Sequence, residues 1–101
     1  MTIIEVIKNK KQFLSLLLLA DEQENMIDRY LERGTMYVLN DNGVKAECVV
    51  TDECNGILEI KNIATVPEYQ GKGYAKALID FIVKSMPTNI PFYRSEPATV
   101  L

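Results

Sequence analysis

Residues 66–75, which read VPEYQGKGYA, hold the types and spacing most suited to chemistry. This run follows an apolar, strand-like stretch at 57–65 and leads into an amphipathic stretch at 72–85 with helical periodicity. The first turn of a helix has free backbone N–H groups and the positive end of the helix dipole, which suit a phosphate or pyrophosphate. Gly71 and Gly73 lack a Cβ, so a ligand can approach the backbone closely. The P-loop spacing and the dinucleotide-binding glycine fingerprint are both absent, so these features leave phosphate binding and a plain strand–turn–helix connection equally open.

The same run carries a resemblance to a known family. The pattern Gln70-x-x-Gly73-x-Ala75, preceded by the residues IATVP at 63–67, resembles the acetyl-CoA signature of the GNAT N-acetyltransferase superfamily, Q/R-x-x-G-x-G/A. The strand before the loop and the helix after it are also similar to those of the family, so the resemblance extends from about residue 57 to residue 84. It is specific for the family and gives no information on the substrate.

The resemblance implies a fold. We expect a single, partial GNAT domain over residues 1–101, of the α+β class with α/β/α layers. Its sheet would be mixed but mostly antiparallel, with helices on both faces. Beyond Pro87 the family continues with a fifth strand, a fourth helix and two further strands, and most of these would be missing here. Residues 88–94 could instead form a short edge strand, because Pro91 is tolerated only at an edge.

Acetyl-CoA is the co-substrate that the resemblance implies. The backbone N–H groups of the loop would hold the pyrophosphate after the signature residue Gln70, and they belong to Gly71, Lys72, Gly73, Tyr74 and Ala75. The backbone of Ala64, Thr65 and Val66 would pair with the pantetheine arm as an added half-strand would. The Lys72 side chain would either add charge near the phosphates or lie solvated in the first helical turn.

Two residues match positions where family members carry catalytic groups. Acetyl transfer to an amine needs a base to remove a proton from the ammonium, whose usual pKa is about 10.4, and an acid to protonate the leaving thiolate. Glu59 falls where histone-acetylating members place a general base, although it could equally be a solvated charge on a strand. Tyr93 falls where many members place the acid. Tyr69 and Tyr74 are expected to pack or to anchor the loop.

Three functional hypotheses remain from the sequence. The first is an acetyl-CoA-dependent N-acetyltransferase that acts directly on a primary amine of a small molecule or protein. The second is a catalytically impaired CoA-binding or protein-interaction module derived from such a domain, and the third is a small α+β scaffold that binds no CoA. With its C-terminal elements missing, the strand at 57–66 would expose an unpaired edge, so a homodimer through that edge is a further expectation.

Composition excludes several other classes of function. The net charge is −3, which argues against a nucleic-acid partner. The sequence has no histidine, and Cys48 and Cys54 do not form a C-x-x-C pair, so we expect no metal site and no histidine-dependent catalytic group. The start of the chain lacks a signal-peptide pattern, and its apolar runs are too short to span a membrane, so a cytoplasmic location is expected.

Periodicity predicts the elements that must position the loop. Strands are expected at 3–7, 35–39, 44–51 and 57–66, with tight turns at Asn42-Gly43 and Asn55-Gly56. Helices are expected at 10–20, at 22–33 with Asp21 as its N-cap and Gly34 as its stop, and at 72–85. The buried stripe of the last helix would consist of Tyr74, Leu78, Phe81 and Ile82. Cys48 is expected to be buried within its strand.

Overall fold

The computed structural model describes residues 1–53, 57–85 and 92–94. Its centre is a five-stranded sheet with the strand order β1-β2-β3-β4-β5, formed by β1 (Thr2–Val6), β2 (Thr35–Asn40), β3 (Val44–Glu53), β4 (Ile57–Thr65) and β5 (Phe92–Arg94). The first four strands are antiparallel neighbours, and β5 pairs with β4 in parallel. The expected α+β class and mostly antiparallel sheet are therefore confirmed.

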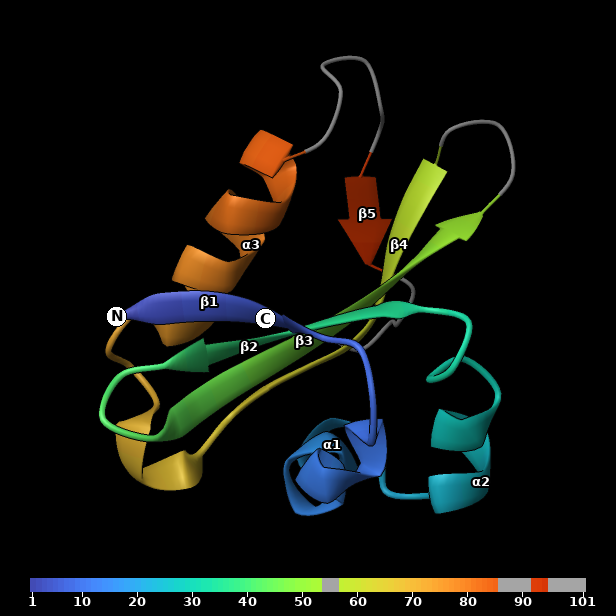
Figure 1. Ribbon diagram of the computed structural model, residues 1–101, viewed down its shortest axis with the longest axis horizontal. Coiled ribbons are helices and arrows are strands. Elements are labelled where there is room, and N and C mark those ends of the chain that lie inside the picture. The colour runs from blue at the N-terminus through green and yellow to red at the C-terminus, as the bar shows by residue number, and fades with distance from the viewer. Residues whose placement is uncertain (54–56, 86–91, 95–101) are drawn as a thin grey trace.

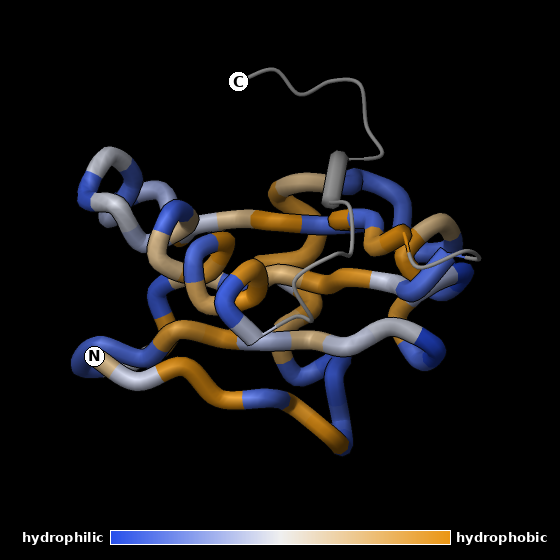
Figure 2. Tube along the Cα trace, turned by 90° about the horizontal axis from the view of Figure 1, so that it is seen from above, coloured by the Kyte–Doolittle hydropathy of each residue, from blue (hydrophilic) through white to orange (hydrophobic). Residues whose placement is uncertain are grey.

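Helices cover both faces of this sheet (Figure 1). The short 3-10 helix η1 (Lys10–Phe13), α1 (Leu14–Ala20) and α2 (Glu24–Asp28) lie on one face, and α3 (Tyr74–Ser85) lies on the other. A second 3-10 helix, η2 (Pro67–Tyr69), follows β4 and leads toward α3. In Figure 2 the hydrophobic stretches follow the strands, whereas most of the turns are hydrophilic.

Two apolar clusters hold the layers together, one on each face of the sheet. Neighbouring strand residues point to opposite faces, so adjacent positions in one strand supply different clusters. The cluster under α1 and α2 contains Val6, Leu17, Ile27, Tyr30, Leu31, Met36, Val38 and Val49. The cluster under α3 contains Leu39, Ala46, Cys48, Val50, Ile60, Leu78 and Ile82. Cys48 is fully buried, as expected.

The second helical region differs from the prediction. Only Glu24–Asp28 is α-helical, and residues 29–33 form turns. Gln23 is the N-cap, without a side-chain cap, because Asp21 instead accepts a hydrogen bond from the Tyr30 hydroxyl at 3.1 Å. A Cβ added to Gly34 would lie 2.9 Å from the Tyr30 carbonyl oxygen and 2.9 Å from a Val49 methyl group, so close packing explains this glycine.

The other expectations on the elements are mostly confirmed. Asn42 and Gly43 have φ of 58° and 109°, as the tight β2–β3 turn requires. The last helix begins two residues later than predicted. The prediction that Phe81 is buried is wrong, because its side chain is 37% exposed and packs only edge-on against Tyr37, with 5.5 Å between the ring centres. β5 pairs with Leu58–Ile60, so the first part of the β4 edge is covered. Cys54, the Asn55-Gly56 turn, Pro87 and residues 88–91 lie outside the described residues.

Lys10 ties η1 to the turns after α2 through its buried side chain. Its amino group donates hydrogen bonds to the carbonyl oxygens of Leu31 at 2.9 Å and Gly34 at 2.7 Å. These carbonyls follow a short helix that offers them no partner of its own. A buried cation therefore takes the place of the helix turns that the sequence pattern predicted.

Replacing Lys10 by methionine should lower the free energy of unfolding by about 2–4 kcal/mol, because two buried carbonyls lose a charged donor. Urea unfolding at pH 7 measures this change. The matched control is Lys11→Met on the same 3-10 helix, since the exposed Lys11 contacts only Glu24 and Asp28 at the surface. The control should leave the unfolding midpoint almost unchanged, and equal losses in both variants would contradict the role of Lys10.

Candidate functional site

The outer edge of β4 presents backbone groups that point away from β3 just before the glycine loop. The Val66 N–H donates to the Lys45 carbonyl at 2.9 Å, and Thr65 lies opposite Ala46. This register makes Thr65–Ala46 a non-hydrogen-bonded pair, so the N–H and C=O of Thr65 point away from β3. By the same alternation, those of Ile63 also point outward. β5 pairs only with Leu58–Ile60, so no strand among the described residues covers these groups.

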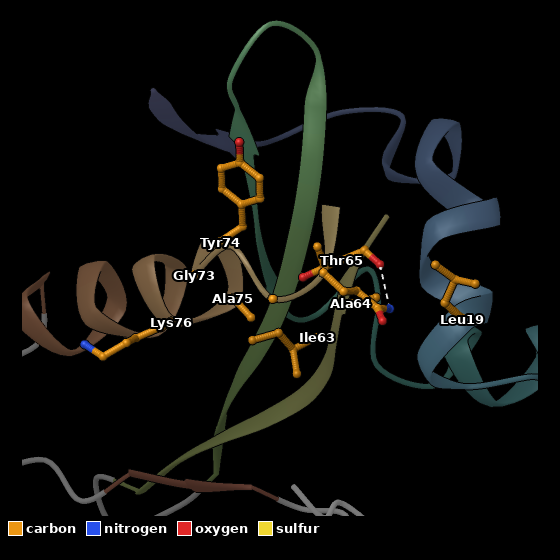
Figure 3. Close-up of a pocket in the computed structure, with 10 residues that line it drawn as sticks. Leu19, Ile63, Ala64, Thr65, Gly73, Tyr74, Ala75 and Lys76 are labelled. Atoms are coloured by element: carbon orange, nitrogen blue, oxygen red, sulfur yellow. Dashed lines mark hydrogen bonds between the residues drawn. The ribbon is translucent and has the colours of Figure 1, made fainter. Parts of the chain in front are cut away.

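A cleft of about 420 Å³ lies against this open edge (Figure 3). The end of β4 forms one side, the start of α3 forms another, and Leu19 of α1 contributes from the opposite face of the sheet. Its lining residues are Leu19, Ile63, Ala64, Thr65, Gln70, Gly71, Gly73, Tyr74, Ala75 and Lys76. The cleft thus brings together seven of the predicted cofactor-binding residues, and Val66 and Lys72 are not among its lining residues.

The glycine loop enters α3 with an open backbone. Gly71 and Gly73 have φ of 83° and 85°, values that favour glycine, and a Cβ at either position would meet no atom within 4 Å. The Gly73 carbonyl accepts the first bond of α3, from the Ala77 N–H at 3.0 Å. The backbone N–H groups of residues 74–76, which lie between Gly73 and Ala77, come before this first helical hydrogen bond, so they are available to an anion. The Gln70 side chain instead holds the loop, because its amide donates to the Thr65 carbonyl at 3.3 Å.

The β2–β3 turn braces the loop from the side. The Tyr74 hydroxyl donates to the Asp41 carboxylate at 2.7 Å, and this hydrogen bond raises the pKa of Tyr74 above its usual value. The Lys45 amino group lies 4.3 Å from the centre of the Tyr69 ring and donates to the Asn42 carbonyl. Both tyrosines therefore anchor the loop, as the sequence indicated.

The two predicted catalytic residues come from neighbouring strands. Glu59 and Tyr93 are backbone partners in the parallel β4–β5 pair. The Glu59 carboxylate forms an ion pair with Lys61 at 2.9 Å, and the side chain of Glu59 is 14% exposed. Only the backbone of Tyr93 is described. Their catalytic roles stay predictions.

A further ionisable residue, Glu47, was not among the site residues predicted from the sequence. It lies on β3 opposite Ala64, is fully buried, and neither of its carboxylate oxygens has a hydrogen-bond partner among the described residues. Burial raises the pKa of the Glu47 carboxyl well above its ordinary value of 4.5. One signal was available in the sequence: a glutamate interrupts an otherwise apolar stretch, residues 46–50, within a strand that is covered on both faces.

Polar groups from three other segments lie on the same face as Glu47. The Asn62 amide donates to the Leu17 carbonyl and to the Tyr30 hydroxyl, each at 3.0 Å, and its Oδ1 has no partner in the described part of the chain. The pKa of Tyr30 is raised, mainly by burial. Glu47 contributes to this shift, since its negative charge would oppose ionisation of the tyrosine. Beneath α1, next to the cleft, the structure therefore contains a buried cluster of polar groups, formed by Glu47, Asn62, Tyr30 and the Leu17 carbonyl.

The raised pKa of Glu47 predicts how stability changes with pH. Between the unfolded and folded pKa values the native state binds more protons, so its stability falls as pH rises above about 4.5. Relative to Glu47→Gln, the free energy of unfolding of the wild type should fall by up to about 1.4 kcal/mol per pH unit in that window. Urea unfolding of both proteins from pH 4.5 to 8 measures the difference. A constant difference would show that Glu47 ionises normally.

No group of three or more possible metal ligands lies together in the described residues. None of the helices that the structure describes combines the length and the apolar character needed to cross a membrane.

Solved structures provide close comparisons for this fold. An IAA acetyltransferase from Bacillus cereus is 35% identical with a TM-score of 0.73, and the match covers 83% of this chain and 57% of that one. A GNAT family acetyltransferase from Elizabethkingia anophelis with acetyl-CoA bound is 32% identical (TM-score 0.73, 83% and 56% covered). A Bacillus subtilis acetyltransferase in complex with CoA is 33% identical (TM-score 0.72, 81% and 55% covered). The chain thus spans little more than half the length of these proteins.

No curated protein is significantly similar to the chain. The family model of the acetyltransferase (GNAT) domain matches residues 32–96, which include β2, β3, β4, the glycine loop and α3. This match covers more than half of the sequence and includes every lining residue of the cleft except Leu19. The chain therefore belongs to the GNAT acetyltransferase family.

Proposed function

We propose that this chain binds acetyl-CoA in the cleft beside β4 and transfers the acetyl group to a primary amine. The observation that carries the proposal is the position of two complementary features in one cleft. The outward backbone groups of Ile63 and Thr65 lie on its β4 side, and the open loop at Gly71 and Gly73 leads into α3 on its other side. Relatives of more than 30% identity hold acetyl-CoA or CoA, which supports the same ligand here.

The chemistry of acetyl-CoA matches these features. Its pyrophosphate carries negative charge, which the backbone N–H groups of residues 71–75 and the dipole of α3 would stabilise. The amides of the pantetheine arm can pair with the outward N–H and C=O of Ile63 and with the outward N–H of Thr65, as an added strand does, whereas the Thr65 carbonyl already accepts from Gln70. The outward groups belong to alternate residues, so Ala64 and Val66 contribute less through their backbone than the sequence reasoning assumed.

Acetyl transfer then requires several proton movements. Glu59 would accept a proton from the ammonium, and the neutral nitrogen would attack the thioester carbonyl carbon. The C–N bond forms, the C–S bond breaks, and the departing thiolate would take a proton from the Tyr93 hydroxyl. The nitrogen would then release its second proton to solvent, from which the Tyr93 oxygen would be reprotonated, so that a neutral amide results. Neighbouring backbone positions of Glu59 and Tyr93 support this division of roles. Lys61 forms an ion pair with the Glu59 carboxylate, so an entering amine has to displace or share this lysine.

A CoA-binding or interaction module without catalysis is the second candidate. The observation that favours it is the Glu59–Lys61 ion pair, which occupies the proposed base. The suggested homodimer remains a prediction, and β5 already occupies the first part of the edge on which it was based. A cytoplasmic location likewise remains a proposal.

Gly73→Val should weaken CoA binding at least about 100-fold, because valine disfavours φ of 85° and would turn several loop N–H groups away from the phosphates. Isothermal titration calorimetry with CoA measures the loss. Lys84→Ala, in the last turn of the same helix, is the control and should bind as the wild type does. Unchanged affinity in a folded Gly73→Val protein would exclude this loop as the phosphate site.

Glu59→Gln and Tyr93→Phe test the catalytic roles. Each should lower kcat by about 10²–10⁴-fold while acetyl-CoA affinity stays the same, because each removes one proton transfer and no cofactor contact. Thiol release and product mass, measured over a panel of primary amines, give the rates. Lys61→Gln is the matched control, since it breaks the ion pair but leaves the carboxylate. Binding of acetyl-CoA without turnover on any amine in the wild type would favour the non-catalytic module.

A further inference from the structure

Glu47 and Asn62 face the same layer of the molecule, beneath α1. Glu47 pairs with Ala64 and Val49 pairs with Asn62, so Glu47 and Asn62 are diagonal neighbours on two adjacent strands. Asn62 donates to the Leu17 carbonyl of α1, which identifies the face. Tyr30, after α2, reaches the same place through its hydroxyl, which accepts from Asn62.

This group contains three hydrogen-bond acceptors without a donor among the described residues, and its one further donor is the O–H that Glu47 carries while it is protonated. The acceptors are the two carboxylate oxygens of Glu47 and Oδ1 of Asn62, none of which has a partner among the described residues. The Asn62 amide already donates twice, to Leu17 and to Tyr30, and the Tyr30 hydroxyl donates to Asp21. Buried acceptors without donors destabilise the fold, and an ionised acceptor does so more than a neutral one.

An apolar side chain at position 47 would avoid this cost. The cross-strand neighbours of Glu47 on this face are Val38 and Ala64, and Val49 follows on the same strand, all apolar. Buried ionic groups replaced by packed apolar residues often leave stability equal or higher. A buried carboxyl that weakens the fold and lies beside a cleft is therefore a candidate for a functional group.

Ala64 connects the buried acceptors with the cleft. Its side chain is only a methyl group, it lines the cleft, and it is the cross-strand partner of Glu47. Leu19 of α1 also lines the cleft, from the face of the sheet that α1 covers and to which Ala64 points (Figure 3). Glu47 is thus one cross-strand position away from a residue that lines the cleft, and Asn62 lies two residues before Ala64 on the same strand.

We propose that Glu47 and Asn62 form a buried subsite for the ammonium group of the acceptor amine, entered past Ala64 from the cleft. A primary ammonium has three N–H donors and one positive charge, which match two carboxylate oxygens and one amide oxygen. This inference rests on the proposed acetyl transfer to an amine. It adds Glu47 of β3 to the part of the site that would bind the amine that receives the acetyl group.

Among the described residues, the amino groups of Lys45 and Lys10 are directed to partners other than Glu47, so a ligand would have to supply the N–H donors for its carboxylate. On its own strand, the Lys45 amino group is directed to Asn42 and Tyr69. The Lys10 amino group is held by the carbonyls of Leu31 and Gly34. From the α1–α2 side come the Tyr30 hydroxyl and, behind it, the Asp21 carboxylate, and neither group supplies a cation.

NMR of the isotopically labelled wild type tests the proposal without any need for activity. The probe is n-butylammonium chloride, and tetramethylammonium chloride is the control because it has the charge but no N–H donor. We expect n-butylammonium to shift the side-chain amide signals of Asn62 and the carboxyl carbon of Glu47. It should also lower the pH at which Glu47 titrates, since an ammonium favours the carboxylate. Tetramethylammonium should cause neither change.

Two variants make the assignment specific. Glu47→Gln should abolish the Asn62 response, whereas Glu53→Gln on the same strand, whose carboxylate contacts Arg33 and Thr51 instead, should keep it. No response of Asn62 and Glu47 at about 100 mM n-butylammonium, or a response confined to other residues, would overturn the subsite. A separate titration with acetyl-CoA distinguishes the two proposals: binding of acetyl-CoA with no ammonium response rejects the subsite alone, and the reverse rejects the proposed function alone.

Discussion

The pairing of β4 determines the architecture of the site. One edge of β4 is bonded to β3 along the strand, up to the Val66 N–H and the Lys45 carbonyl. The other edge meets β5 only at Leu58–Ile60. A strand that is fixed on one side and open on the other presents backbone donors and acceptors in a rigid row. The glycine loop continues directly from this row, so the geometry of the loop is set by the same pairing.

The surroundings of β4 keep that row and the loop in place. Leu78 and Ile82 dock α3 on one face, and the Tyr74–Asp41 hydrogen bond fixes its first turn. On the other face the buried Lys10 holds the turns after α2. This second face also contains the buried carboxyl of Glu47, which has no hydrogen-bond partner among the residues that the structure describes. Apolar packing thus stabilises the face on which α3 and the proposed phosphate loop lie. The opposite face contains a destabilising polar group, Glu47, where the acceptor amine of the proposed reaction would enter.

Sequence patterns predicted the strands, the β2–β3 turn and α3 well because each depends on local residues. Asn42-Gly43 supplies its own backbone preference, and the spacing of Leu78 and Ile82 defines a face. The prediction for the α2 region was wrong because the turns that replace the expected helix depend on Lys10, which is more than ten residues away in the sequence. Glu47 and Asn62 form one group only through the β3–β4 register, which no local pattern reveals. The loop was found because its glycines and helix start lie in one short run.

An amide NMR titration with acetyl-CoA tests the central claim most directly. The account predicts large shifts for the backbone amides of Ile63 and Thr65 and for those of residues 71–76. The amide of Ala64, which is directed toward β3, should change less than those of its two neighbours, because only alternate residues face the cleft. An absence of shifts at millimolar acetyl-CoA, or shifts confined to surfaces away from β4 and α3, would contradict the account.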